Sequence, residues 1–166
     1  MQFSYSTFGK PYLEQELYGN LCFNLSHSDG LALLAVARGR KLGIDVERIR
    51  PEIIKENVAE HFFSPEEVTK LRSLPVDQQA EAFFNCWTRK EAYIKARGEG
   101  LSIPLDQFNV SLMPGEPAAL LEMKIDPEEV NRWHMMELVS GSNFKAADER
   151  QLEGASSLLV QKAILR

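Results

Sequence analysis

Apolar and polar positions alternate from Leu21 to Ser26, which predicts a β-strand. The turn signal Asp29-Gly30 separates this segment from the apolar run LALLAVA, so the two are expected to form a hairpin. A second turn, RGRK, precedes LGIDVE, which is expected to be a third strand. Three strands in close succession indicate an antiparallel meander, whereas the polar first 20 residues are expected to form a loop.

Helical spacing replaces this alternation after residue 50, first in PEIIKENVAEHFF. Ser64 then has the position of an N-cap before Pro65, and Glu67 completes a capping box for a helix that extends to about residue 73. A longer helix is expected from about residue 77 to 96, with Gly98 as its C-cap.

Further strands are predicted in FNVSL, AALLEMKI and WHMMELVS, and the tail after Ala146 fits either a short helix or a strand. Strands and helices in this order predict an α+β fold, in which helices pack on an antiparallel sheet. The length of 166 residues suits one domain or two small subdomains.

Composition and charge narrow the function classes. The net charge of −5 argues against binding to a nucleic-acid backbone, which favours a basic face. Cys22 and Cys86 form no CxxC pair, so no zinc or thiol redox site is expected and both are interpreted as buried small side chains. No signal peptide is evident, and the apolar run from residue 31 to 37 is too short to cross a bilayer. We expect a cytoplasmic protein that binds neither nucleic acid nor membrane.

Asp45 and Glu47 lie two residues apart in GIDVE, so a strand places both carboxylates on one face. Their repulsion costs little at a solvated sheet edge, but it is costly in a cleft unless a cation lies between them. Oxygen ligands of this kind suit Mg²⁺. The motif alone leaves both interpretations open, a solvated edge and a magnesium site.

The longest predicted helix places Glu91 on its apolar face. Phe83 and Trp87 are four residues apart, Glu91 is four beyond Trp87, and Ile94 closes the stripe. Lys95 lies one turn after Glu91 on the same face. The pair fits a surface ion pair, or a partly buried carboxylate that acts as metal ligand or base beside a lysine that clamps phosphate.

His27 stands near the end of the strand FNLSHS, just before a turn. It could act as a general base or an anion ligand, or it could be a strand-end histidine without a special function. The neighbouring serine does not make a hydrolase signature, because adjacent strand residues point to opposite faces and no nucleophile elbow is present.

The order of the motifs is more specific than any one of them. GKP, FNLSHS, GIDVE, FFSPEE and WTRKEAYIKARGEGL follow one another along the chain. This series resembles the Sfp-type 4'-phosphopantetheinyl transferases, whose hallmark is a GIDxE-like strand followed at a distance by a W-x-x-KE-x-x-x-K helix. The resemblance covers about residues 9 to 112, and it implies the α+β half-domain of that family.

The resemblance implies that the phosphopantetheine arm of the substrate coenzyme A is transferred, with Mg²⁺, to a serine of an acyl or peptidyl carrier protein. Adenosine 3',5'-bisphosphate would be the other product. Asp45, Glu47 and Glu91 would hold the metal, and Lys95 would contact the pyrophosphate. Glu91 would also accept the serine proton, either directly or through a metal-bound water.

The resemblance also implies contacts to the two substrates. Ser26 and His27 would bind the 3'-phosphate of coenzyme A, with Lys10 of the GKP segment nearby. Lys90 and Lys95 would contact the other phosphates. The surface around Phe62 and Phe63, with the helix that follows, would face the carrier protein.

The chain departs from the family in its extent. Sfp-type enzymes contain two similar halves with the coenzyme A site between them. Residues 1–30 correspond to a remnant of the first half that ends in the FNLSHS strand, and residues 31–166 to the second half. Most of the first half, with its basic residues for the adenosine end, has no counterpart. The tail after Asp148 also lacks the small-residue strand expected at the end of the second half.

Three explanations fit this shortfall: a gene start assigned too late, a fragment of a longer chain, or a homo-oligomer in which another copy replaces the missing half. A non-catalytic homologue that still binds a carrier protein is the alternative in function. Another Mg²⁺-dependent nucleotide or pyrophosphate enzyme is a second alternative. The retained metal and lysine residues favour the active transferase, and the missing half favours the non-catalytic homologue.

Overall fold

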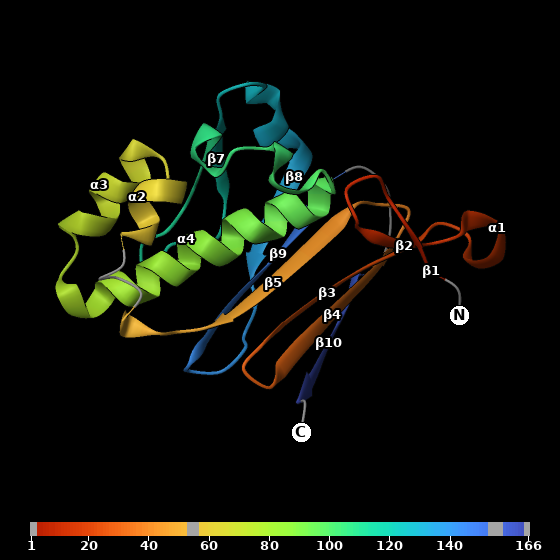
Figure 1. The fold of residues 1–166 in the computed structure, drawn as a ribbon, viewed down its shortest axis with the longest axis horizontal. Coiled ribbons are helices and arrows are strands. Elements are labelled where there is room, and N and C mark those ends of the chain that lie inside the picture. Colours follow the sequence, from red (N-terminus) through yellow and green to blue (C-terminus); the bar gives the residue numbers. More distant parts are fainter. Residues whose placement is uncertain (1–2, 53–56, 153–157, 165–166) are drawn as a thin grey trace.

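The computed structural model describes residues 3–52, 57–152 and 158–164. Two three-stranded antiparallel sheets form the framework, and Figure 1 shows where their strands lie. One has the order β10-β4-β3, with β3 at Leu21–Ser28, β4 at Leu31–Arg38 and β10 at Leu158–Ile164. The other has the order β5-β9-β8, with β5 at Leu42–Arg48, β9 at Phe144–Gln151 and β8 at Trp133–Glu137. The predicted α+β fold with antiparallel strands is confirmed.

The long helix α4 (Val76–Arg97) lies across strands β5 and β9, as Figure 1 shows. It ends at Gly98, whose φ of 74° is the left-handed conformation expected of a helix C-cap. No helix of the described residues is long and apolar enough to cross a membrane. The predicted three-strand start of the chain is present, but the third strand, β5, joins a different sheet from β3 and β4.

Most of the other helices and strands that follow β5 cover the other side of α4. They are α2 (Val58–Phe62), α3 (Pro65–Ser73), β6 (Phe108–Val110) and β7 (Leu120–Met123), with 3-10 turns η2 (Gly100–Ser102), η3 (Leu105–Gln107) and η4 (Pro127–Arg132). The predicted capping box is confirmed, since Ser64 accepts from the Glu67 amide while the Glu67 carboxylate accepts from the Ser64 amide. Residues 53–56 of the helix predicted after residue 50 lie outside the described residues.

The prediction of a loop over the first 20 residues is wrong. This segment contains β1 (Phe3–Tyr5), β2 (Pro11–Leu13) and the short helix α1 (Gln15–Tyr18), and the two strands pair antiparallel. Strands of three residues are too short to show alternation in the sequence. Tertiary contacts support them, because the ring of Phe3 lies 5.5 Å from that of Phe23 and Leu13 is buried.

Apart from Leu152, the described residues after 146 form strands. β9 continues to Gln151 as the central strand between β5 and β8, and β10 pairs with β4 along its whole length. The division of the chain near residue 30 into a remnant of the first half and a second half stays a prediction. β3 and β4 lie on opposite sides of that division and pair with each other throughout.

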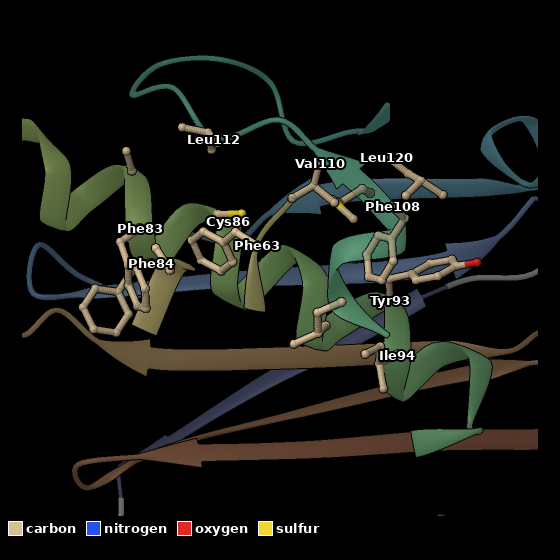
Figure 2. Packing of buried hydrophobic residues seen from close by; sticks show 14 of the residues in the cluster. Phe63, Phe83, Phe84, Cys86, Tyr93, Ile94, Phe108, Val110, Leu112 and Leu120 are labelled. Atoms are coloured by element: carbon tan, nitrogen blue, oxygen red, sulfur yellow. The ribbon is translucent and has the colours of Figure 1, made fainter. Parts of the chain in front are cut away.

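The hydrophobic core has two parts, on either side of the sheet that α4 covers. The larger part surrounds α4, where Phe83, Tyr93 and Ile94 pack with Phe63 and Phe108, as Figure 2 shows. The smaller part lies between the two sheets and contains Leu31, Leu33, Ala35, Ala37, Leu42, Ile44, Val46 and Ala146. Cys86 is buried as expected, whereas Cys22 is only half-buried.

Gly43 sets how closely α4 approaches β5. A Cβ atom at this position would lie 2.1 Å from the carbonyl oxygen of Ala92 and 2.3 Å from the amide nitrogen of Ala96. Only glycine permits this approach of two backbones. Asp45, two residues along the same face of β5, is thereby brought within reach of Lys95 on α4.

Candidate active site

A cavity of about 340 Å³ lies where β3, β5 and α4 meet. Six residues predicted from the sequence line it together with Leu25 and Trp87: Ser26, His27, Asp45, Glu47, Glu91 and Lys95. The strands supply the first four and the helix supplies the last two. The structure therefore brings together all three predicted metal ligands and both residues predicted to act in catalysis.

Asp45 is the most buried of the three acids that line the cavity, with only 3% of its surface exposed. Its Oδ1 accepts a hydrogen bond from the Lys95 ammonium at 2.6 Å and another from the Ser26 hydroxyl at 2.9 Å. Among the described residues, its Oδ2 is buried and finds no hydrogen-bond partner. A buried carboxylate oxygen without a partner is costly, so this atom is suited to a ligand that enters the cavity.

Glu91 is half-buried on the apolar face of α4, as the helical spacing predicts. Burial raises the pKa of its carboxyl group above the ordinary value, and the negative charges of Asp45 and Glu47 raise it further, while Lys95 opposes them. The three carboxylates are therefore close enough to repel one another, as expected for a site that holds a cation.

The donor set fits Mg²⁺ in kind, because all three side chains offer oxygen and carry negative charge. Among the residues the structure describes, no three His, Cys, Asp or Glu side chains converge tightly enough to hold an ion by themselves. Such convergence is not required, since Mg²⁺ is usually held by one or two carboxylates together with waters and substrate phosphates. The fit to Mg²⁺ is favoured by Asp45 Oδ2, a buried oxygen that has no hydrogen-bond partner among the described residues.

His27 and Lys95 add the groups that could contact an anion. The His27 side chain is exposed at the rim of the cavity, while Ser26, its neighbour, points inward and is buried. The Ser26 hydroxyl is engaged by protein atoms, because it donates to Asp45 and lies 3.2 Å from the Lys95 ammonium. His27 is thus more accessible to a ligand than Ser26.

Lys10 lines a second cavity of about 320 Å³, which shares Leu25, Glu91 and Lys95 with the first. Its ammonium donates to the carbonyl oxygens of Leu42 and Ala96 at 3.0 and 3.3 Å. Burial lowers the pKa of Lys10 to about 8. The structure therefore brings Lys10 beside the predicted site, with its charge at the C-terminal end of α4.

The structure does not bring Lys90 to the cavity. This side chain is 1% exposed, forms an ion pair with Glu67 at 2.8 Å and donates to the carbonyl oxygens of Leu105 and Phe108. Consecutive helix residues point about 100° apart, so Lys90 faces α3 and β6 while Glu91 faces the strands. The predicted phosphate contact of Lys90 is replaced by a structural contact.

The two phenylalanines predicted at the carrier-protein surface differ in exposure. Phe62 is 40% exposed and lies edge-on to the ring of Trp87, with 5.7 Å between centroids. Phe63 is 3% exposed and packs on Phe83 in the core. Of this pair, Phe62 is the one that remains accessible to a partner.

Asn24 and Ser28 hydrogen-bond to the strand that carries the site acids, and the sequence interpretation missed both. The Ser28 hydroxyl donates to Glu47 Oε2 at 2.8 Å, and the Asn24 side-chain oxygen accepts from the Ile44 amide at 2.8 Å. A signal was present in FNLSHS, where polar side chains alternate on one face of the strand. It could not be interpreted without knowing that β5 lies beside that face.

Comparison with protein families and curated relatives agrees with the motifs. A model of the 4'-phosphopantetheinyl transferase superfamily matches residues 41–147, which is more than half of the chain. The 4'-phosphopantetheinyl transferase HetI of Nostoc sp. is 43% identical over 148 residues, which are 89% of this chain and 59% of that protein. The 4'-phosphopantetheinyl transferase Sfp of Bacillus subtilis is 37% identical over 112 residues, which are 68% of this chain and 48% of that protein.

Among solved structures, the fold is similar to that of the Thermotoga maritima holo-[acyl-carrier-protein] synthase. The TM-score is 0.50 at 23% sequence identity, over 67% of this chain and 62% of the other. At this identity the likeness concerns the fold alone. The chain spans about half the length of the curated relatives that it matches.

Proposed function

The chain belongs to the 4'-phosphopantetheinyl transferase superfamily, and on this premise we propose that it transfers the 4'-phosphopantetheine arm of coenzyme A to a serine of an acyl or peptidyl carrier protein. One observation carries the proposal. A single cavity combines Asp45, Glu47 and Glu91 with Lys95, so carboxylates for a divalent cation lie beside a cation for phosphate.

Asp45, Glu47 and Glu91 would hold Mg²⁺, which supplies neutralisation of phosphate charge when bound. The hydroxyl oxygen of the carrier serine forms a bond to the phosphorus that carries the pantetheine arm. The bond from this phosphorus to the bridging oxygen of the pyrophosphate breaks, and adenosine 3',5'-bisphosphate leaves with that oxygen. The Lys95 ammonium lies on the cavity wall, where it would stabilise the negative charge that develops on the leaving oxygen.

Glu91 is the proposed acceptor of the serine proton. Burial raises the pKa of this carboxyl group, and the nearby charges of Asp45 and Glu47 act in the same direction. A bound divalent cation would oppose this shift, so the role of Glu91 as a base rests on its position beside the other two carboxylates on the cavity wall. Direct transfer and transfer through a water both fit the position of Glu91 on the cavity wall.

The coenzyme A contacts are proposed to involve His27 and Ser26 at the 3'-phosphate, with Lys10 in the adjoining cavity. The exposed imidazole of His27 and the position of Lys10 support this arrangement. The carrier protein would approach over Phe62 and α3. We place the reaction in the cytoplasm, where both substrates would be available.

A homo-oligomer, in which a second copy of the chain would contribute to the coenzyme A cleft, is a further proposal. The second candidate function is a non-catalytic homologue that binds a carrier protein. The Lys95 ammonium lies 2.6 Å from Asp45 Oδ1, and this ion pair favours the second candidate because it occupies a predicted metal ligand. An activity measurement separates the two candidates.

The transfer assay incubates the chain with coenzyme A, Mg²⁺ and a panel of apo carrier proteins, and follows each carrier by intact-protein mass spectrometry. We expect a phosphopantetheine mass increment on at least one carrier and none when Mg²⁺ is chelated. A full-length transferase serves as the positive control on the same carriers. Unmodified carriers throughout, beside an active control, would reject the catalytic function and favour the binding homologue.

A further inference from the structure

Strands β3 and β5 lie next to each other but belong to different sheets. Side chains of β3, and not its backbone, accept hydrogen bonds from the facing edge of β5. Three amides of β5 donate to them: Ile44 to the Asn24 oxygen at 2.8 Å, and Val46 and Arg48 to the hydroxyls of Ser26 and Ser28, each at 3.2 Å. The unpaired edge of β5 is thus satisfied by alternate polar side chains of a single strand.

The two serines of this arrangement repeat one unit. Each hydroxyl accepts from an amide of β5 and donates to the carboxylate one residue earlier, Ser26 to Asp45 at 2.9 Å and Ser28 to Glu47 at 2.8 Å. A hydroxyl has one proton to donate. Because the backbone amide holds the oxygen in place, that proton is directed at the carboxylate.

We propose that Ser28 is a positioning residue, which holds the Glu47 carboxylate in the orientation needed in the cavity. Ser28 itself is not among the residues that line the cavity, so it would act through Glu47 alone. Ser26 differs, since it lines the cavity and also contacts Lys95. This inference rests on the proposed function, in which Glu47 helps to hold a divalent cation.

The role explains why β3 presents a serine at both positions. Asp45 and Glu47 repel each other, and Glu91 adds a third negative charge. A free Glu47 side chain would rotate away from the other two carboxylates towards solvent. A hydrogen bond from a fixed hydroxyl opposes this rotation, as outer hydrogen bonds orient the ligands of metal sites in general.

The test compares Ser28→Ala with Ser28→Thr, which keeps the hydroxyl. Ser73→Ala is the matched control, because Ser73 is an exposed serine on α3 whose hydroxyl donates to the Lys70 carbonyl. Mn²⁺ affinity is measured by electron paramagnetic resonance with coenzyme A present and no carrier protein, and crystal structures record the Glu47 side chain. We expect Ser28→Ala to weaken Mn²⁺ binding about tenfold or more and to reorient Glu47. Ser28→Thr and Ser73→Ala should leave both unchanged.

An unmoved Glu47 in Ser28→Ala, or unchanged Mn²⁺ affinity, overturns the positioning role. Neither readout depends on catalysis, so the outcome differs from a failure of the proposed function, which would appear as absent transfer in the mass assay. If the wild-type chain binds no Mn²⁺ at all, the metal site itself is rejected, and with it the purpose assigned to Ser28.

Discussion

Lys90 and Glu91 are neighbours in the KE pair of α4, yet their side chains enter different parts of the molecule. Lys90 forms a buried ion pair with Glu67, whose carboxylate also accepts from the amides of Ser64 and Val110. Glu91 faces the cavity with Asp45 and Glu47. The basic residue of the pair therefore joins α4 to α3 and β6, and the acidic one remains available for chemistry.

Helical spacing was sufficient to place Glu91 and Lys95 on one face, because both lie on the stripe that starts at Phe83. It could not assign Lys90, since the partner Glu67 lies in another helix and the pairing depends on how α3 packs on α4. The same limit applies to Ser28, whose acceptor Glu47 becomes a neighbour only when β3 and β5 meet.

Glu91→Gln is predicted to lower the transfer rate by about 10²- to 10⁴-fold, because the amide can neither accept the serine proton nor supply a charged ligand. We expect no loss of stability, because Glu91 is only half-buried and the substitution removes a negative charge that Asp45 and Glu47 repel. Single-turnover transfer and thermal unfolding measure the two effects. Near-normal turnover in the folded variant would remove Glu91 from the mechanism.

At the scale of elements, contact between α4 and β5 at Gly43 determines whether the site exists. The helix supplies Glu91 and Lys95 and the strand supplies Asp45 and Glu47, so their distance depends on this single close approach. The sequence showed a glycine ahead of two acids. It could not show that the backbone of α4, about 50 residues later, lies where a side chain at position 43 would be.

Gly43→Ala is predicted to destabilise the fold by about 3 kcal/mol or more, because its Cβ would overlap backbone atoms that cannot rotate away. Gly9→Ala is the comparison: its φ is +81° but the space around it is open, so only backbone strain of about 1–2 kcal/mol applies. Chemical denaturation measures both. Equal, small losses for the two variants would contradict the close approach of α4 to β5.

β9 carries an unusual pair of acids for the central strand of a sheet. Asp148 is 1% exposed and Glu149 is 0% exposed, and among the described residues none of their carboxylate oxygens has a hydrogen-bond partner. Burial raises the pKa of Asp148 to about 6, with Arg150 opposing. Burial and the charge of Asp148 raise the pKa of Glu149 well above its ordinary value. The family match ends at residue 147, directly before this pair.

Because the pKa values of both acids are raised in the folded chain, we expect the free energy of unfolding to fall as the pH rises. The folded chain keeps a proton on Glu149 at pH values where the unfolded chain, with a pKa near 4.5, has lost it. Unfolding then releases a proton, so the free energy of unfolding decreases as pH increases above about 4.5. Glu149→Gln should remove this part of the slope, and Glu149→Met should stabilise the fold by about 1–3 kcal/mol at pH 8.

Urea unfolding between pH 5 and pH 8 measures these slopes for the wild-type chain and both variants. Asp148→Asn serves as the comparison, since its contribution should be confined to the range from about 3.8 to about 6. Parallel stability curves for the wild type and Glu149→Gln would show that Glu149 is ionised in the folded protein, contrary to its buried position.

At the scale of the whole molecule, the order of motifs predicted more than any single element. The strand with Asp45 and Glu47 and the helix with Glu91 and Lys95 meet as the family resemblance implies. The sequence interpretation missed the short β1–β2 hairpin and left the tail with β9 open between helix and strand, because tertiary contacts stabilise segments whose own pattern is weak. The proposed chemistry depends on this one cavity.

Calorimetric titration of the chain with coenzyme A, in the presence and absence of Mg²⁺, tests most directly whether this cavity is a cation-dependent phosphate site. We expect saturable binding that is about tenfold or more tighter with Mg²⁺, because the carboxylates and the phosphates would share the cation. Absence of binding, or an affinity that Mg²⁺ leaves unchanged, would show that the cavity is no cation-dependent phosphate site.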